Sequence, residues 1–209
     1  MSTRAATGVT ATASKIELRR ALREQRRALP PDARHLAAQQ LAVHLTETPA
    51  FRASKRIGCY LANDGEIETD AVITHIRRQR KHCFLPVLSR LSHDRLWFAP
   101  AEPGAELVAN RYGILEPLVP ASALVRAQHL DLLLLPLVGF DRAGHRLGMG
   151  GGFYDRSLEF LRHRRVWRKP HVIGLAYDFQ QVVALPREAW DVPLDAVVTD
   201  QAIYFVVQR

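Results

Sequence analysis

The chain has 209 residues, of which 47% are hydrophobic and 24% are charged, and its formal net charge is +8. This length and composition fit one globular domain with a sizeable core. The longest apolar run, Leu132–Phe140, is far shorter than the roughly 20 residues of a membrane-spanning helix, which excludes a transmembrane protein. The positive charge favours anionic partners such as nucleotides, polycarboxylates or nucleic acid, without choosing among them.

The first residues indicate where the folded domain begins, and the two cysteines indicate the redox state of its cellular compartment. Residues 1–14 are mostly small and contain no apolar core, so we expect a flexible N-terminal tail rather than a secretory signal. Residues 15–209 are expected to form a single α/β domain. Cys59 and Cys83 form no CxxC motif and lie in apolar stretches. They are expected to be buried thiols in a reducing compartment, with a disulfide as the alternative.

A helix is predicted over Lys15–Leu29, with Ser14 as its N-cap and two prolines after its end. Helical spacing places three leucines on one stripe, namely Leu18, Leu22 and Leu29. The adjacent sector is basic and holds Lys15, Arg19, Arg23 and Arg26. Residues of that sector next to the leucine stripe can lie at the rim of a buried interface and point into a cleft.

The remaining elements alternate between helices and strands. Helices are predicted over Asp32–Thr46, Thr69–Arg80 and Phe153–Arg164. Strands are predicted over Arg56–Ala62, His82–Leu88, Arg95–Ala99, Leu130–Val138, His171–Tyr177, Asp195–Thr199 and Ala202–Val207. The central strands are apolar throughout, as strands covered on both faces are. The fold class predicted is therefore α/β, a mostly parallel open sheet with helices on both faces, three-layered and Rossmann-like.

A glycine cluster follows the most apolar strand. Five glycines lie between Gly144 and Gly152, and a predicted helix begins directly after them. Glycines at this density cost chain entropy and bury no side chain, so we expect a ligand to approach this backbone. Ligands of parallel α/β sheets bind beyond the carboxyl ends of strands, and the N–H groups at a helix start attract phosphate. The pattern predicts a phosphate cradle with Arg146 beside it.

The cluster by itself leaves alternatives open. It forms neither a P-loop nor a GxGxxG motif, because the string reads Gly148-Met149-Gly150-Gly151-Gly152, and a mobile surface loop has the same composition. Asp155, in the first turn of the predicted helix, either complements the helix dipole or holds magnesium beside bound phosphates. By spacing alone, Glu66 is a turn acid before a helix, and Arg20, Arg23 and Arg27 belong to a solvated helix face.

Several spaced motifs resemble one known family. The string GFDRAGHRLGMGGGFYDRSL is similar to the signature of the 5-formyltetrahydrofolate cyclo-ligases, and KIELRRALREQRR is similar to that family's amino-terminal KxxLR helix. Further segments resemble the family in the same order, namely IGCYLANDGEIETDAVI, RKHCFLPVL, YGILEP and IGLAYDFQQ...LPREAWDVPLDAVVTD. The resemblance therefore extends from Lys15 to Asp200.

The resemblance implies an ATP- and magnesium-dependent ligase. Its members convert 5-formyltetrahydrofolate to 5,10-methenyltetrahydrofolate and release ADP and phosphate, through phosphorylation of the formyl oxygen and ring closure by N10. The implied cofactors are ATP and Mg2+. The implied partner is the folate substrate, with or without a polyglutamate tail, rather than nucleic acid or a membrane. We expect a cytoplasmic monomer.

The resemblance also implies site residues, carried over position by position. Contacts to ATP fall on Lys15, Arg19, Arg146, Leu147, Gly148, Met149, Gly150, Gly151, Gly152, Phe153 and Tyr154. Folate contacts fall on Leu61, Glu66, Met149, Gly150, Gly151, Gly152 and Phe153. The magnesium ligands fall on Asp155 and Asp191. Arg146, Lys15 and Arg19 are the expected catalytic cations.

One departure from the family and two rival functions remain. Some family members carry basic residues inside the loop where this chain has Met149 and Gly151, so the transferring phosphoryl charge must be balanced from elsewhere. One rival is a sugar-phosphate or acyl-CoA enzyme on a similar scaffold. The other is a nucleic-acid-binding module, suggested by RRALREQRR, RRQRK and RHRRVWRK. These clusters fall on different predicted helices, mostly without stacking aromatics, which disfavours the second rival.

Overall fold

The computed structural model describes residues 14–88, 94–164, 169–186 and 188–206. A seven-stranded sheet forms its centre, in the order β11-β10-β9-β6-β1-β2-β3. The strands are β1 (Arg56–Gly58), β2 (His82–Leu88), β3 (Leu96–Pro100), β6 (Leu132–Pro136), β9 (His171–Ala176), β10 (Ala196–Thr199) and β11 (Ile203–Phe205). Within these described ranges, no helix has the length and apolar character needed to cross a membrane.

The five inner strands are parallel, and only the two edge strands run antiparallel to their neighbours. From β1 the chain moves to β2 on one side, and later elements add β6 and then β9 on the other side. The strand order therefore reverses between β1 and β6. In open α/β sheets, ligands bind beyond the carboxyl ends of the strands at such a point.

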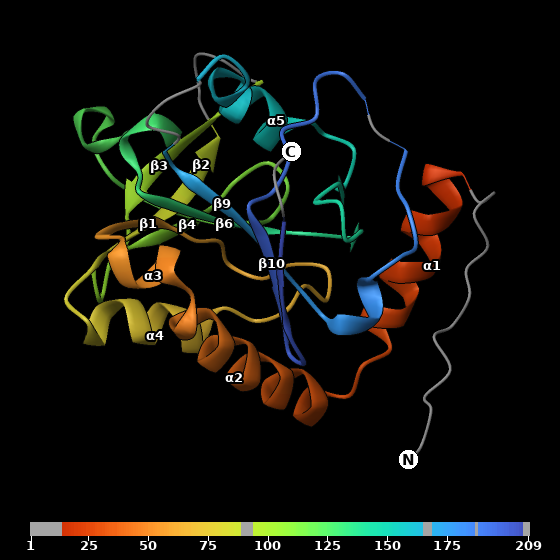
Figure 1. The fold of residues 1–209 in the computed structure, drawn as a ribbon. Coiled ribbons are helices and arrows are strands. Elements are labelled where there is room, and N and C mark those ends of the chain that lie inside the picture. Colours follow the sequence, from red (N-terminus) through yellow and green to blue (C-terminus); the bar gives the residue numbers. More distant parts are fainter. Residues whose placement is uncertain (1–13, 89–93, 165–168, 187, 207–209) are drawn as a thin grey trace.

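Helices cover both faces of the sheet, which confirms the predicted three-layer arrangement (Figure 1). One face packs against α2 (Pro31–Glu47), α3 (Pro49–Ala53) and α4 (Asp70–Arg78). The other face packs against α5 (Phe153–Leu158) and the 3-10 turns η2 (Ala127–His129) and η3 (Glu159–Arg162). Leu132, Leu133, Leu134 and Leu135 of β6 are fully buried and alternate between the two faces. The expectation of a strand covered on both sides is confirmed.

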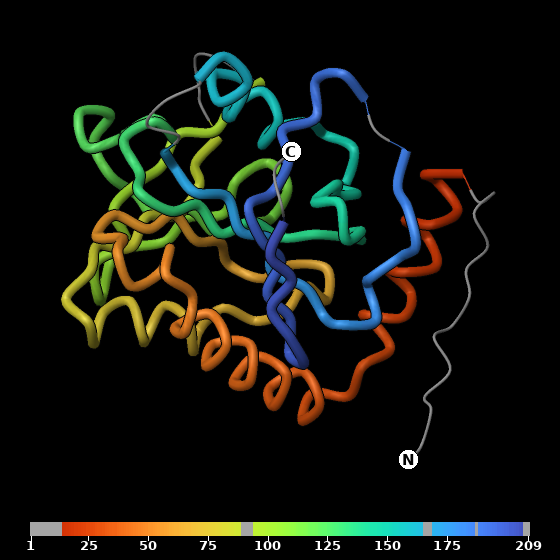
Figure 2. The backbone as a smooth tube through the Cα atoms, viewed as in Figure 1, coloured from red at the N-terminus to blue at the C-terminus, as the bar shows by residue number. Residues whose placement is uncertain are grey.

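The first helix, α1 (Lys15–Arg27), lies beside the carboxyl end of the sheet. The Ser14 hydroxyl accepts from the Glu17 N–H, and the Glu17 side chain accepts from the Ser14 N–H, which completes a capping box. Leu18 and Leu22 pack against a small cluster that includes Leu185. Figure 2 shows the blue segment 181–186 running alongside α1.

The buried stripe of α1 differs from the predicted one. Arg26 follows Leu22 at the i+4 position and is fully buried, whereas Leu29 lies beyond the helix end. The predicted stripe of three leucines therefore missed Arg26, which the periodicity places in the adjacent basic sector. An arginine is rarely buried unless it is paired, and the partner of Arg26 lies 38 residues away in sequence.

Some elements are shorter than predicted. The predicted strand Arg56–Ala62 ends as β1 at Gly58, and the predicted helix Phe153–Arg164 is the six-residue α5 followed by a 3-10 turn. The Ser157 hydroxyl donates to Phe153 O at 2.7 Å and accepts from Leu96 N at 2.8 Å. Such a side-chain bond competes with the helical ladder, and here it coincides with the early end of α5.

Several short elements were not predicted. They include two hairpins, formed by β4 (Leu107–Ala109) with β5 (Leu115–Pro117) and by β7 (Gly139–Phe140) with β8 (Arg146–Leu147). The 3-10 turns η1 (Ala121–Ala123) and η4 (Asp178–Gln180) are the other short elements that were not predicted.

Cys59 and Cys83 are free and buried, which confirms the expectation of buried thiols and excludes a disulfide between them. The predicted tail, apart from Ser14, and Val207 of the last predicted strand lie outside the described residues.

Candidate active site

A cavity of about 710 Å³ opens at the carboxyl ends of β1 and β6, where the strand order reverses. Its walls come from α1, the turn after β1, the β4–β5 hairpin, the chain after β8 and the segment before β10. All residues that the resemblance assigned to a site line this cavity: Lys15, Arg19, Leu61, Glu66, Arg146, Leu147, Gly148, Met149, Gly150, Gly151, Gly152, Phe153, Tyr154, Asp155 and Asp191. The fold thus brings together positions that are up to 176 residues apart in sequence.

The glycine loop (Gly148–Gly152) forms one wall of the cavity. A Cβ added at Gly148 or Gly150 would meet no protein atom within 4 Å, so the space beside this backbone is open. Gly150 has φ +99°, which side chains rarely adopt. The open, side-chain-free backbone at the cavity wall fits a group that hydrogen-bonds main-chain N–H groups, as phosphates do.

Two features of the predicted cradle need correction. Gly144 is not part of it, because this residue has φ +84° in the β7–β8 turn and an added Cβ would meet Val206 at 2.8 Å. The helix after the loop, α5, has only six residues and begins after Gly152, which has a left-handed conformation. So short a helix offers only a weak dipole to an anion, which leaves the backbone N–H groups of the loop and the nearby cations as the main candidates for that contact.

Arg146, at the start of β8, brings a buried cation to the cavity. Its side chain is 7% exposed, and its guanidinium donates to Val192 O and to Asp155 Oδ1. Burial lowers the pKa of Arg146, while the charges of Asp155 and Asp191 oppose that shift. An arginine stays protonated in proteins, so a fixed positive charge lies next to two carboxylates at the glycine loop.

The two cations of α1 also reach this cavity, beside the glycine loop. Leu18 and Leu22 anchor the helix, and Lys15 and Arg19 lie at the edge of that buried stripe. Lys15 Nζ lies 3.1 Å from Glu188 Oε1, and Arg19 Nε donates to Gly148 O at 2.8 Å. Glu188 did not stand out in the sequence, because only tertiary structure brings it to Lys15.

Asp155 and Asp191 offer the carboxylate oxygens that magnesium prefers. Asp155 Oδ1 accepts from Arg146, and Asp191 Oδ2 accepts from Glu188 N at 2.9 Å. No cluster of three or more metal-ligating side chains occurs in the described part of the chain. This donor set fits Mg2+, which usually binds one or two carboxylates, keeps several waters and takes its other ligands from substrate phosphates.

The turn after β1 also lines the cavity. Leu61 and Glu66 line it, and Glu66 Oε2 accepts from Asn63 N at 3.1 Å. Burial raises the pKa of Glu66 to about 7, although the Asn63 N–H and the charge of Arg26 oppose the shift. Glu66 is therefore partly protonated near neutral pH, which a surface turn acid is not.

The β4–β5 hairpin forms an apolar wall that element prediction missed. Asn110, Tyr112, Ile114 and Leu115 line the cavity, and the Tyr112 ring meets the Phe153 ring edge-on at 6.3 Å. The Asn110 side-chain oxygen accepts from the N–H groups of Tyr112 and Ile114, which shapes the hairpin turn. The cavity thus combines a charged, glycine-lined end with an aromatic and aliphatic wall, which suits an elongated ligand with one anionic and one ring-bearing part.

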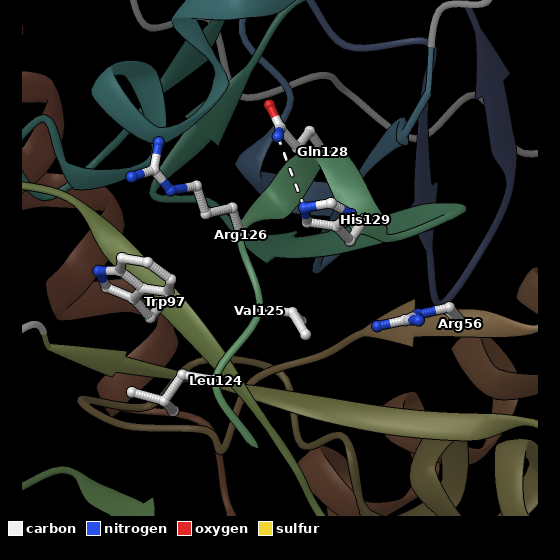
Figure 3. A pocket seen from close by; sticks show the side chains of 7 residues that line it. All are labelled: Arg56, Trp97, Leu124, Val125, Arg126, Gln128 and His129. Atoms are coloured by element: carbon white, nitrogen blue, oxygen red, sulfur yellow. Dashed lines mark hydrogen bonds between the residues drawn. The ribbon is translucent and has the colours of Figure 1, made fainter. Parts of the chain in front are cut away.

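A smaller cavity of about 330 Å³ lies elsewhere, lined by Arg56, Trp97, Leu124, Val125, Arg126, Gln128 and His129. In Figure 3, Arg56 and Arg126 extend on either side of Val125. Each guanidinium covers an aromatic ring, Arg56 over Phe84 and Arg126 over Trp97. None of the predicted site residues lines this cavity, so we assign the candidate active site to the larger one.

Comparison with known proteins identifies the family. The model of the 5-formyltetrahydrofolate cyclo-ligase family matches residues 11–200. The chain is similar to a 5-formyltetrahydrofolate cyclo-ligase of Escherichia coli, with 40% identity over 88% of this chain and 98% of that protein, and to a mouse enzyme of the same name, with 31% identity over 93% and 97%. Its structure is similar to the NMR structure of 5,10-methenyltetrahydrofolate synthetase from Aquifex aeolicus, with a TM-score of 0.77, 30% identity and coverage of 93% and 94%. With a family match over most of its length and a fold shared with a solved synthetase, the chain belongs to the 5-formyltetrahydrofolate cyclo-ligase family.

Proposed function

We propose that the protein converts 5-formyltetrahydrofolate to 5,10-methenyltetrahydrofolate and consumes ATP with Mg2+ in the process. The observation that carries this proposal is the single cavity that all fifteen residues implied by the family motifs line. It has a glycine-lined, cation-rich end for a triphosphate and an aromatic wall for the folate rings. Its volume of about 710 Å³ lies within the range of ligand pockets, roughly 300–1,000 Å³.

The reaction needs alignment and charge stabilisation more than it needs an enzyme nucleophile. The formyl carbon is part of an amide and is a poor electrophile. Transfer of the γ-phosphoryl group to the formyl oxygen converts that oxygen into a phosphate leaving group. N10 of the folate then attacks the activated carbon and gives up its proton, the five-membered ring closes and phosphate departs. Proteins accelerate such phosphoryl transfers mainly by positioning and electrostatics.

The residues of the cavity divide these tasks. Backbone N–H groups of the glycine loop bind phosphate oxygens. Arg146, Lys15 and Arg19 balance the phosphoryl charge, which matters because Met149 and Gly151 add no cation to the loop. Asp155 and Asp191 hold Mg2+, which neutralises phosphate charge when it is bound. Glu66 accepts hydrogen bonds from the guanidine-like N–H edge of the pterin, a donor face that suits a carboxylate.

The absorbance rise of methenyltetrahydrofolate tests the proposal directly. Purified protein with 5-formyltetrahydrofolate is expected to form product only when ATP and Mg2+ are both present, with one phosphate released per ring closed. Phosphate release from ATP without the folate would favour another phosphoryl-transfer enzyme on this scaffold. Formation of methenyltetrahydrofolate at the same rate without ATP would reject the proposed mechanism.

Lys15 is expected to act on ATP rather than on the folate. Replacement of Lys15 by alanine is expected to raise the KM for ATP about tenfold, since a lost hydrogen bond from a charged donor costs ~1.5–3 kcal/mol, and to leave the KM for folate within twofold. Steady-state kinetics with each substrate varied in turn measures both values. Arg20→Ala on the exposed side of the same helix is the matched control. Equal changes in both KM values for Lys15→Ala would contradict the assignment.

Glu66 gives folate binding a specific pH dependence. Its pKa of about 7 means that the side chain is mostly protonated at pH 6 and mostly ionised at pH 8. The carboxylate accepts two hydrogen bonds from the pterin edge, whereas the acid places its own O–H against those donors. The affinity for 5-formyltetrahydrofolate is therefore expected to rise between pH 6 and pH 8 and then level off. Calorimetric titrations across this range measure it, and Glu66→Gln should bind weakly with no such rise.

A further inference from the structure

The fully buried guanidinium of Arg26 connects three parts of the cavity. It donates to Asp64 O at 2.8 Å, to Asp64 Oδ2 at 2.7 Å and to Leu137 O at 3.3 Å. Its Nη2 also lies 3.8 Å from the sulfur of Met149 in the glycine loop. Burial of a charge is costly unless the charge is paired and hydrogen-bonded, and these contacts supply that pairing. Arg26 therefore joins α1 to the turn after β1, the end of β6 and the glycine loop.

The turn that Arg26 contacts has little conformational freedom in its backbone. Asp64 and Gly65 both have positive φ, at 53° and 74°, and Glu66 N donates to Asn63 O at 3.0 Å. This is the signature of a type I′ turn, which favours Asp-Gly at its centre. A Cβ at Gly65 would lie 3.2 Å from Arg26 O. The turn and the last residues of α1 are thus in close backbone contact.

Asp64 forms ion pairs with more than one arginine. Arg23 Nε lies 2.7 Å from Asp64 Oδ2, and Arg27 pairs with Oδ1. Burial would raise the pKa of Asp64, but the hydrogen bonds from Arg23, Arg27 and Arg26 hold it well below its usual range. Only Arg26 among these three is fully buried, whereas the Arg27 side chain is 54% exposed. Arg27 therefore shares the partner of Arg26 without its contacts to Leu137 and Met149.

We propose that Arg26 is a positioning residue, which ties the Asn63–Glu66 turn to Met149 of the glycine loop and so fixes Glu66 at the folate end of the cavity. The identity of the ligand rests on the proposed function. Glu66 immediately follows the gripped residues Asp64 and Gly65, so a loosened turn displaces its carboxylate. A misplacement of about 1 Å costs up to ~100-fold in catalysis.

The charges around Glu66 make this role measurable. The positive charge of Arg26 lowers the pKa of Glu66, and the negative charge of Asp64 raises it. Tyr60 and Tyr154 also face Glu66, and burial raises both of their pKa values well above 10, so they stay neutral. Loss of the Arg26 charge and loss of the Asp64 charge should therefore move the titration of Glu66 in opposite directions.

The first measurement is the pH titration of Glu66 in the free protein. NMR of protein with glutamate labelled at the carboxyl carbon monitors this titration. Arg26→Met is expected to shift the midpoint to higher pH, and Asp64→Asn is expected to shift it to lower pH. Arg26→Lys keeps the charge and should leave the midpoint near that of the wild type. A wild-type midpoint in Arg26→Met would show that the Arg26 side chain does not set the surroundings of Glu66, and the proposal would fail.

The second measurement is the affinity for 5-formyltetrahydrofolate, titrated without ATP. Arg26→Met and Arg26→Lys are each expected to weaken binding at least tenfold, because a lysine cannot form the forked contacts of an arginine. Arg27→Met is the matched control, since it loses a contact to the same Asp64, and should weaken binding less than twofold. Wild-type affinity in Arg26→Lys, or an equal loss in Arg27→Met, would overturn the positioning role.

The two measurements distinguish failure of the positioning role of Arg26 from failure of the proposed enzyme function. A wild-type protein that bound no 5-formyltetrahydrofolate would reject the function, while the Glu66 titration would still decide whether Arg26 sets this carboxyl. If Arg26→Met does not fold, Arg26→Lys and Asp64→Asn provide both readouts. Thermal unfolding of each variant shows which of them are folded before they are titrated.

Discussion

Replacement of Arg146 by methionine is expected to lower the kcat of the cyclo-ligase reaction roughly a thousandfold, in line with the loss of a preorganised cation at a transferring phosphoryl group. The Arg146 side chain is 7% exposed and lies between Asp155 and Val192 O. The glycine loop itself carries no cation. Arg146 is thus the fixed positive charge beside the position proposed for the γ-phosphate.

Rate measurements with saturating ATP and folate test this expectation. Arg142→Met is the matched control, because Arg142 lies in the turn of the same β7–β8 hairpin, is exposed and stacks over Tyr204 away from the cavity. Arg142→Met should keep its rate within twofold. Thermal unfolding should show that Arg146→Met is folded at the assay temperature. A folded Arg146→Met variant with a loss below tenfold would remove Arg146 from the catalytic assignment.

Asp155→Asn is expected to lower kcat about a hundredfold and to raise the Mg2+ concentration needed for half-maximal rate. Asparagine has nearly the size of aspartate and can still accept a hydrogen bond from Arg146, so the packing around it is kept while the charge that binds the cation is lost. A carboxylate that only complemented the start of α5 would contribute ~0.3–1 kcal/mol to stability and nothing to magnesium dependence.

Magnesium titrations of the rate, with calorimetric ATP binding in Mg2+ and in EDTA, separate these two roles. Asp155→Asn should weaken ATP binding in Mg2+ and leave binding in EDTA unchanged. Glu159→Gln provides the control, because Glu159 directly follows α5 and pairs with Arg95 at the surface. An unchanged magnesium requirement in Asp155→Asn would return Asp155 to a structural role at the helix start.

Local sequence patterns determined the elements of this fold well. The run of leucines in β6 predicted a doubly covered strand, and Ser14 with Glu17 formed the expected helix start. These features depend on neighbouring residues and on periodicity, which the sequence displays directly. Element ends were less predictable: α5 ends early next to Ser157, whose hydroxyl accepts a hydrogen bond from Leu96 of β3, in a distant part of the chain.

Some features of the candidate site could likewise be predicted from the sequence, and others only from the tertiary structure. The sequence by itself determined the glycine loop, the basic face of α1 and the family to which their motifs belong, because these are properties of contiguous segments. Only the tertiary structure decided that Lys15 meets Glu188, that the β4–β5 hairpin walls the cavity and that Arg26 is buried on Asp64. The pKa of Glu66 also depends on tertiary structure, since burial and the charge of Arg26 set it. The physical reason is that burial and ion pairing depend on contacts between segments far apart in the chain, which no local periodicity encodes.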